Sequence, residues 1–272
     1  MNILKRWFLQ SPIYNFNVVE RDRWVSRQAA AVPPGSRVLD VGAGSCPYRR
    51  HFEGCIYRTQ DFVALNPAQL LDKQGYGQID YICDAEAIPV EDGSFDLVLC
   101  TEVLEHVPDP AGVVKELSRL LRPGGTLLLT APLGSGLHQA PYHFYGGYTP
   151  FWYRKTLQEA GFDHIEIEAN GGFFKHYGQE TIRLAKLTAP GRLRSSWLLK
   201  ALWAPVWIAA LPWMVGICPV LAYYFDRFDD SQDFTIGYHV SATKSGFDNH
   251  PICIREEGEE VVSAGHAGVR KA

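Results

Sequence analysis

Short apolar runs alternate with longer amphipathic segments between residues 36 and 170. The apolar runs predict buried strands near residues 37–41, 55–60, 79–83, 95–101, 125–131 and 163–169, with one more near 234–243. The segments between them predict helices near 47–53, 110–122 and 150–160. Alternation of this kind is typical of a doubly wound α/β sheet.

The same pattern divides the chain into five parts. They are an N-terminal helical cap (1–35), an α/β core (36–170), an apolar helical insertion (171–233), the last strand (234–244) and a polar tail (245–272). Within the cap we expect a helix over 18–31 that ends at a Pro-Pro-Gly sequence. We also expect an amphipathic turn with the apolar side chains Ile3, Leu4, Trp7 and Phe8.

The insertion contains an uncharged run over residues 201–225, which is long enough to cross a membrane. Two observations argue against a single crossing. Pro205, Pro212 and Pro219 are expected to kink one continuous helix repeatedly. The last strand must also return to the same sheet, on the same side of the membrane. We therefore expect residues 201–225 to lie in the membrane interface, with a buried helical hairpin that forms a lid or dimer contact as the alternative.

Composition narrows the range of partners. The 272 residues are 46% hydrophobic and carry a formal charge of −4, with a pI near 6.1. Nucleic acid is not expected as a partner, because phosphate binding needs a concentrated positive surface. Six cysteines are scattered without a C-x-x-C pair, so we expect no metal and reduced thiols. No signal peptide is expected, and the predicted location is cytoplasmic.

A glycine turn follows the first predicted strand. Gly42 and Gly44 allow a tight turn and close approach of a ligand to the backbone. Asp40 stands two residues before the first glycine, where a carboxylate suits a cationic group such as an ammonium or a sulfonium. Pro47 occupies the third position of a G-x-G-x-x-G pattern, which argues against a dinucleotide.

Polar side chains also follow the next three predicted strands. Asp61 follows the second strand, at a distance suited to hydrogen bonds from two ribose hydroxyls. Asp84 follows the third strand and can accept from an adenine amine, while Glu102 and His106 follow the fourth. Each aspartate alone is more simply explained as a helix cap or a solvated turn. Four such positions at successive strand ends point instead to one ligand site.

Four segments together carry a family resemblance. They are V-L-D-V-G-A-G, D-A-E-A-I-P-V-E-D-G-S-F-D-L-V-L, E-V-L-E-H-V and L-R-P-G-G-T-L-L-L-T. In this order they resemble the motifs of the class I methyltransferases that use S-adenosylmethionine (SAM), over residues 36–170 and the last strand. The resemblance implies a seven-stranded sheet, mostly parallel, whose antiparallel last strand inserts between the fifth and sixth.

The resemblance also assigns roles to residues. It implies that Asp40, Gly42 and Gly44 hold the methionine part of SAM, Asp61 the ribose, Asp84 and Ala85 the adenine, and that Glu102 and His106 lie beside the sulfonium. If the second strand is shifted by one residue, Gln60 would make the ribose contact in place of Asp61.

The loop after the fifth predicted strand contains candidates for catalysis. His143 and His138 are candidate bases for the acceptor, together with His106, which can equally brace the loop. The aromatic side chains of this loop can form a cation–π wall or simply pack over the sheet edge: Tyr142, Phe144, Tyr145 and Tyr148.

The expected function is methyl transfer from SAM to a small or lipid-linked acceptor, at a hydroxyl group. One alternative is an NAD-dependent oxidoreductase, which Pro47 and the absence of a suitably placed Tyr-x-x-x-Lys pair disfavour. A second is a non-catalytic SAM-binding adaptor at a membrane. We expect peripheral contact with the cytoplasmic face of a membrane through residues 201–225, and a homodimer is left open.

Overall fold

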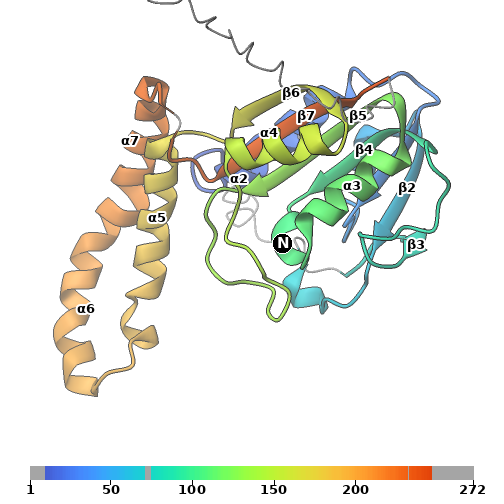
Figure 1. Cartoon of the computed structure of the whole chain (residues 1–272). Coiled ribbons are helices and arrows are strands. Elements are labelled where there is room, and N and C mark those ends of the chain that lie inside the picture. The colour runs from blue at the N-terminus through green and yellow to red at the C-terminus, as the bar shows by residue number, and fades with distance from the viewer. Residues whose placement is uncertain (1–9, 71–74, 232, 247–272) are drawn as a thin grey trace, which may run out of the picture.

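The computed structural model describes residues 10–70, 75–231 and 233–246. The predicted turn of Ile3, Leu4, Trp7 and Phe8 and almost all of the polar tail lie outside these residues. Within them, the predicted doubly wound α/β sheet and the helical insertion before its last strand are both present (Figure 1).

Seven strands form one sheet in the order β3-β2-β1-β4-β5-β7-β6. Their bounds are β1 Arg37–Val41, β2 Ile56–Asp61, β3 Tyr81–Ile82, β4 Phe95–Thr101, β5 Leu121–Pro132, β6 Phe162–Ala169 and β7 Gly237–Lys244. The strands from β1 to β5 pair in parallel, and β7 runs antiparallel to both β5 and β6. The fold class is therefore confirmed, including the insertion of the last strand between the fifth and sixth.

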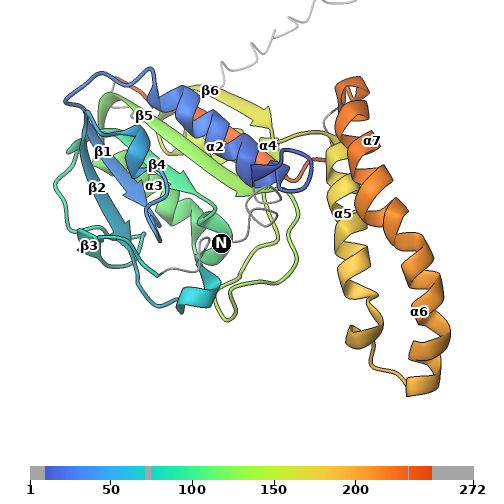
Figure 2. The same ribbon diagram turned by 180° about the vertical axis from the view of Figure 1, so that it is seen from behind.

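Helices cover both faces of the sheet. α3 (Pro110–Leu120) and α4 (Pro150–Glu159) lie on one face, and α2 (Phe16–Ala29) lies on the other, as the two opposite views show (Figures 1 and 2). α3 begins as expected, because the Asp109 carboxylate accepts the Gly112 N–H at 2.9 Å. The helix predicted over 47–53 is only the 3₁₀ turn Arg49–His51, since Pro47 and Gly54 leave too few residues for stable helical turns.

Two apolar clusters fill the layers. The larger lies between the sheet and α3 and α4, where Leu117, Tyr153 and Leu157 are fully buried. The smaller lies beneath α2, where Trp24 and Val25 pack against the side of the sheet that includes Val38 and Leu99. Burial on both faces explains why the central strands are almost continuously apolar in sequence.

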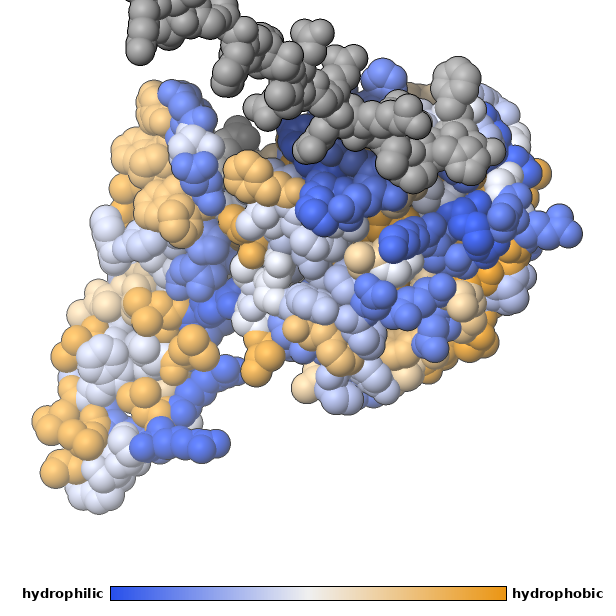
Figure 3. Space-filling model, viewed as in Figure 1, coloured by the Kyte–Doolittle hydropathy of each residue, from blue (hydrophilic) through white to orange (hydrophobic). Residues whose placement is uncertain are grey.

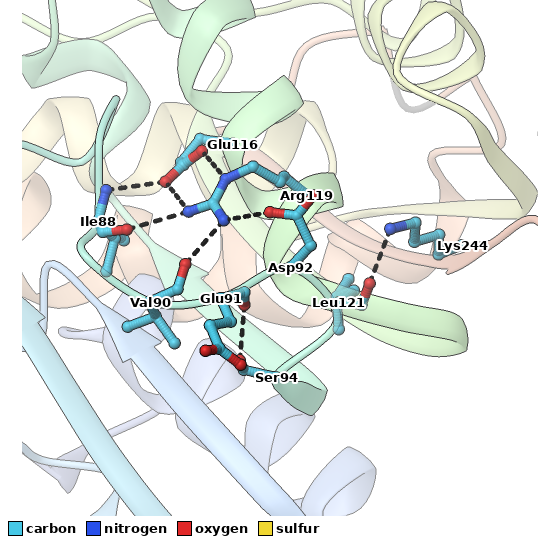
Figure 4. A network of polar contacts seen from close by, with 9 residues as sticks. All are labelled: Ile88, Val90, Glu91, Asp92, Ser94, Glu116, Arg119, Leu121 and Lys244. Atoms are coloured by element: carbon cyan, nitrogen blue, oxygen red, sulfur yellow. Dashed lines mark hydrogen bonds and ion pairs between the residues drawn. The ribbon is translucent and has the colours of Figure 1, made fainter.

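A polar clamp attaches the connection between β3 and β4 to α3 (Figure 4). The Arg119 guanidinium donates to the carbonyls of Ile88 at 3.0 Å and Val90 at 2.7 Å, and it pairs with Glu116. Glu116 in turn accepts the Ile88 N–H at 2.8 Å. The clamp fixes the segment that directly follows Asp84 and Ala85.

The insertion between β6 and β7 forms a helical hairpin. Its first arm is α5 (Phe173–Leu187), and its second arm is a continuous helix over Trp197–Phe228. The second arm consists of α6 (Trp197–Leu211), the π-helical turn η5 (Pro212–Ile217), α7 (Cys218–Phe225) and the 3₁₀ turn η6 (Asp226–Phe228). The hairpin stands beside the α/β body and extends past it (Figures 1 and 2). The three prolines therefore do not break the helix. Pro205 lies inside α6, and the helix widens into the π turn at Pro212.

Specific contacts hold the two arms together. The indole N–H groups of Trp203 and Trp207 donate to the carbonyls of Thr188 at 2.8 Å and Ala185 at 3.0 Å, at the C-terminal end of α5. These bonds satisfy carbonyls that have no partner inside the helix. Gly178 allows close contact near the other end, because a Cβ there would lie 2.9 Å from the Ala222 Cβ.

The base of the hairpin is fixed by carboxylates. Asp226 accepts the N–H groups of Gly172 and Lys175 at 3.0 and 2.9 Å, and Asp229 accepts that of Phe173 at 2.6 Å. The first N–H groups of α5 are thus capped by side chains at the end of the second arm. The second arm nevertheless stays largely exposed within the single chain.

Candidate active site

A cavity of about 900 Å³ opens at the carboxyl ends of β1, β2, β3 and β4. Every residue to which the sequence assigned a part of SAM lines it: Asp40, Gly42, Gly44, Asp61, Asp84, Ala85, Glu102 and His106. This is the edge of an open α/β sheet at which ligands bind. The cavity size lies in the range of small-molecule and cofactor sites.

The glycine turn depends on the absence of side chains. Gly42 and Gly44 have φ of 69° and 53°, in the left-handed region that glycine tolerates best. A Cβ on Gly42 would lie 2.3 Å from the Val103 Cγ2, so no side chain fits there. The turn residues Gly42, Ala43 and Gly44 all line the cavity.

Asp40 is a buried carboxyl group of the site. It is 1% exposed, and the Tyr57 hydroxyl donates to its Oδ2. Its Oδ1 is buried and has no hydrogen-bond partner among the described residues. Burial raises the pKa of Asp40 to about 7, an effect that the hydrogen bond from Tyr57 partly offsets. An unpartnered buried oxygen of this kind is a ready acceptor for a cationic ligand group.

The two candidates for the ribose contact have different partners. Gln60 is occupied on both ends of its amide, accepting the Gly42 N–H at 3.2 Å and donating to the Cys83 carbonyl at 2.6 Å. Asp61, the last residue of β2, accepts the N–H groups of Gly44 and Val63, each at 2.9 Å. Each carboxylate oxygen of Asp61 keeps acceptor capacity for a ligand hydroxyl.

An ion pair that the sequence did not predict closes one side of the cavity. Arg21 of α2 is 5% exposed, and its Nη1 lies 3.2 Å from the Glu102 Oε2. Its Nε donates to the Tyr48 hydroxyl at 3.0 Å, and the Thr130 hydroxyl donates to the other Glu102 oxygen at 2.9 Å. Arg21 precedes Trp24 and Val25 by three and four residues, so the buried face of the predicted helix was the available signal.

Three histidines come together at the cavity. The ring centroids of His106 and His138 are 4.8 Å apart, and those of His138 and His143 are 4.6 Å apart. His106 and His138 line the cavity, whereas His143 lies beside them and is not among its lining residues. Burial lowers the pKa of His106 to about 4, and it also lowers the pKa of His143. His106 and His143 are therefore neutral at pH 7.

The aromatic residues of the loop after β5 divide into two groups. Tyr142 and Phe144 line the cavity. Tyr145 and Tyr148 use their hydroxyls for structure, donating to the carbonyls of Pro108 at 2.9 Å and Leu104 at 2.7 Å. The predicted aromatic wall is therefore limited to Tyr142 and Phe144 among these four.

The site fits SAM in three respects. The unpartnered Asp40 oxygen suits the α-ammonium, the bare backbone at Gly42 admits close approach, and the carboxylates continue along the strand ends to Asp84. When bound, SAM would supply an electrophilic methyl group on a cationic sulfur.

Comparison with known proteins agrees with this geometry. Residues 39–129 match the family model described as a methyltransferase domain. The chain is 35% identical over 183 residues to the sarcosine/dimethylglycine N-methyltransferase of Halorhodospira halochloris, covering 59% of this chain and 63% of that protein. It is 37% identical over 127 residues to a ubiquinone biosynthesis O-methyltransferase of Xanthomonas campestris pv. campestris (strain B100), covering 44% and 52%. The chain thus spans less than two thirds of the length of these relatives.

A solved structure supports the fold. A candidate sarcosine dimethylglycine methyltransferase from Galdieria sulphuraria superposes with a TM-score of 0.51 at 18% identity, covering 84% of this chain and 86% of that one. At this identity the likeness concerns the fold alone. Together, the motifs, the sheet order and the matched family show that the chain carries a class I methyltransferase domain, whose cofactor is S-adenosylmethionine.

Proposed function

We propose that this protein transfers the methyl group of SAM to a hydroxyl of a small, amphipathic or lipid-linked acceptor. The observation that carries the proposal is the buried, unpartnered Asp40 oxygen in a cavity where carboxylates continue along the strand ends. One relative is named as an N-methyltransferase of sarcosine and dimethylglycine, and another as an O-methyltransferase of ubiquinone biosynthesis. The predominantly apolar cavity lining favours an acceptor of the second kind.

In this proposal the protein mainly positions the two reactants. Asp40, Gly42 and Gly44 hold the amino-acid end, Asp61 holds the ribose hydroxyls, and Asp84 and Ala85 border the adenine. Glu102 is fixed by Arg21 and Thr130 beside the reacting end. Correct alignment of acceptor and methyl group supplies much of the rate enhancement in such a displacement.

An imidazole near the acceptor can also remove its hydroxyl proton. His138 is the best placed for this role, because it lines the cavity and is exposed. The Nδ1–H of His106 donates to the Tyr142 carbonyl, so His106 positions the loop as well. General-base assistance typically contributes about 10²–10⁴-fold to a rate.

We further propose that the helical hairpin holds the protein on a membrane surface. By length and composition, Trp197–Phe228 is the one helix of the described chain that could cross a membrane, and only 22% of its apolar window is buried. Apolar surface gathers over the hairpin (Figure 3), including the exposed side chains Trp197, Leu198, Leu199, Leu202, Val206 and Ile208. Arg192 and Arg194 are exposed in the connection between the arms, where they can meet anionic headgroups.

If the hairpin lies flat on the cytoplasmic face of a membrane, its exposed apolar side chains and its arginines are both accounted for without a membrane crossing. Both ends of the hairpin return to neighbouring strands, β6 and β7, of one sheet. An amphipathic acceptor in the same membrane would then be within reach of the cavity. The alternative occupant of the apolar surface is a second copy of the chain.

Cofactor choice is tested by calorimetry with SAM, S-adenosylhomocysteine and NAD. We expect the first two to bind and NAD not to bind. Asp61→Ala should weaken SAM binding by roughly 1–3 kcal/mol, and Asp61→Asn, which keeps an acceptor, should weaken it less. Tight binding of NAD without SAM would overturn the proposal. Unchanged affinity in Asp61→Ala would move the ribose contact to Gln60.

The role of the histidines is tested by separating turnover from binding. His138→Ala and His143→Ala should each lower turnover more than SAM affinity, with labelled SAM and a lipid extract as the acceptor source. Full activity in both variants would make these side chains structural. SAM binding without transfer to any fraction would favour the non-catalytic adaptor.

Membrane contact is tested by flotation with anionic liposomes. Leu202→Glu and Trp213→Glu should reduce flotation, whereas Ile82→Glu, at an exposed apolar residue of the sheet edge, should not. Trp207 is unsuitable for this test, because its indole supports α5. A dimer that ignores liposomes would assign the surface to a second copy.

A further inference from the structure

The three clustered histidines at the cavity meet the geometric requirements of a metal site. One ligand nitrogen from each of His106, His138 and His143 lies within 4.8 Å of the other two. Three nitrogens bound to one zinc ion at about 2.0–2.1 Å lie roughly 3.3 Å apart in tetrahedral geometry. Two of the histidines belong to the loop after β5, so a loop adjustment of about 1.5 Å would close even the widest separation.

Hydrogen bonds fix which nitrogen is available on two of the rings. The Nδ1 of His106 pairs with the Tyr142 carbonyl, and the Nδ1 of His138 pairs with the Gly136 carbonyl at 2.9 Å. A carbonyl only accepts, so each Nδ1 carries the proton and each Nε2 keeps its lone pair. Metal-binding histidines usually donate their second N–H to a backbone carbonyl in this way.

The third ring and a nearby carboxyl group have unused capacity. The Nδ1 of His143 is buried without a partner among the described residues. Glu105 is 1% exposed, its Oε1 lies 3.6 Å from the His106 Nε2, and its Oε2 also has no partner there. A buried carboxyl group beside the His106 imidazole would balance part of the charge of a cation.

We propose that His106, His138 and His143 bind a divalent transition-metal ion of the zinc class at the acceptor side of the cavity. Three imidazole ligands with a remaining open position are typical of catalytic rather than structural zinc sites. Nitrogen ligands favour zinc, cobalt or nickel over magnesium and calcium. Sequence spacing gave no indication of this site, because the histidines come from two loops.

The site deepens the proposed function, on which its chemical role rests. An acceptor hydroxyl that coordinates the open position would lose its proton to solvent more easily. The oxygen would then form its bond to the methyl carbon as the carbon–sulfur bond breaks, and the electron pair of that bond would remain on sulfur. The metal would thus take over much of the work expected of a general base.

Metal binding can be measured directly on the full chain. After chelator treatment and dialysis, calorimetry with Zn²⁺ and absorption titration with Co²⁺ should give one equivalent per chain, and Mg²⁺ should give none. His138→Ala and His143→Ala should each weaken Zn²⁺ binding by more than about 100-fold. Loss of a residue that only supports a metal ligand by a hydrogen bond typically weakens binding by roughly 10–100-fold. His164→Asn is the matched control, because His164 is exposed, and its φ of 48° suits asparagine.

Two outcomes would overturn the proposal. One is the absence of Zn²⁺ and Co²⁺ binding. The other is equal binding by the wild type and the His138→Ala/His143→Ala double variant, which would place the metal elsewhere on the chain. S-adenosylhomocysteine binding, measured on the same samples, separates the two proposals. Binding of this ligand without zinc rejects the metal site alone, and binding of zinc without this ligand rejects the proposed function alone.

Discussion

Removing one partner of the ion pair between Arg21 and Glu102 should destabilise the protein strongly, although the two residues lie far apart in sequence. Arg21→Met removes the guanidinium, keeps most of the side-chain volume and leaves the Glu102 carboxylate without its countercharge. Loss of one partner of a buried ion pair costs about 3–5 kcal/mol. The Glu102 side chain is 29% exposed and keeps its bond from Thr130, so we expect about 3 kcal/mol, at the lower end of that range.

The same helix provides a matched control. Arg27 pairs with Glu168 at 2.9 Å, but the two side chains are 62% and 49% exposed. Arg27→Met should therefore change the free energy of unfolding by no more than about 1 kcal/mol. Urea unfolding followed by tryptophan fluorescence compares the two variants.

A second substitution separates charge from packing. If an uncompensated Glu102 carboxylate causes the loss, Glu102→Gln should recover part of it in the Arg21→Met background. Equal losses in Arg21→Met and Arg27→Met would refute the reasoning. The contact would then be an accidental pairing at the rim of the cavity.

Three further predictions concern other parts of the molecule. Because burial raises the pKa of Asp40 to about 7, ionisation of this carboxyl group opposes folding increasingly as the pH rises from about 4 to 7. Asp40→Asn should therefore have a free energy of unfolding higher than that of the wild type by more than about 1 kcal/mol at pH 8, but not at pH 4. Equal stability of the two proteins at both pH values would contradict this prediction. The same variant should bind SAM more weakly at pH 8. Gly42→Ala should abolish SAM binding and lower the free energy of unfolding by more than the roughly 1–2 kcal/mol expected for the control Gly35→Ala. At Gly35 φ is 82°, but no atom lies within 4 Å of the position that a Cβ would take. Similar unfolding free energies for the two variants would refute the steric argument. Asp226→Ala should lower the free energy of unfolding by about 1–2 kcal/mol and speed proteolysis of the hairpin, because the N–H groups of Gly172 and Lys175 lose their acceptor. The affinity for SAM should stay unchanged.

Sequence patterns predicted the parts of the fold that depend on local chemistry. β1 and β4 have the predicted bounds, because short apolar runs bounded by turns determine buried strands. The start of α3 was predictable from Asp109 and Pro110, which satisfy the helix N-terminus by themselves. The gathering of Asp40, Asp61 and Asp84 around one cavity was predictable, because a parallel sheet brings its strand ends to one edge.

The missed features depend on contacts between distant segments. The continuity of the long helix could not be predicted from Pro205 and Pro212, because it depends on indole bonds to α5 and on close packing at Gly178. The pairing of Arg21 with Glu102 depends on how α2 lies on the sheet. The histidine cluster combines a residue after β4 with two from the loop after β5, and no sequence spacing encodes that distance.

The position of β7 has a consequence for biosynthesis. Among the described strands β6 pairs only with β7, and the whole hairpin lies between them in the chain. During translation the apolar hairpin therefore emerges while β6 is still unpaired and the sheet is incomplete. Closure of the sheet is a late, non-local step. A membrane or a chaperone that receives the hairpin at that stage would cover its apolar surface and hold the ends of β6 and β7 close together until the sheet is complete.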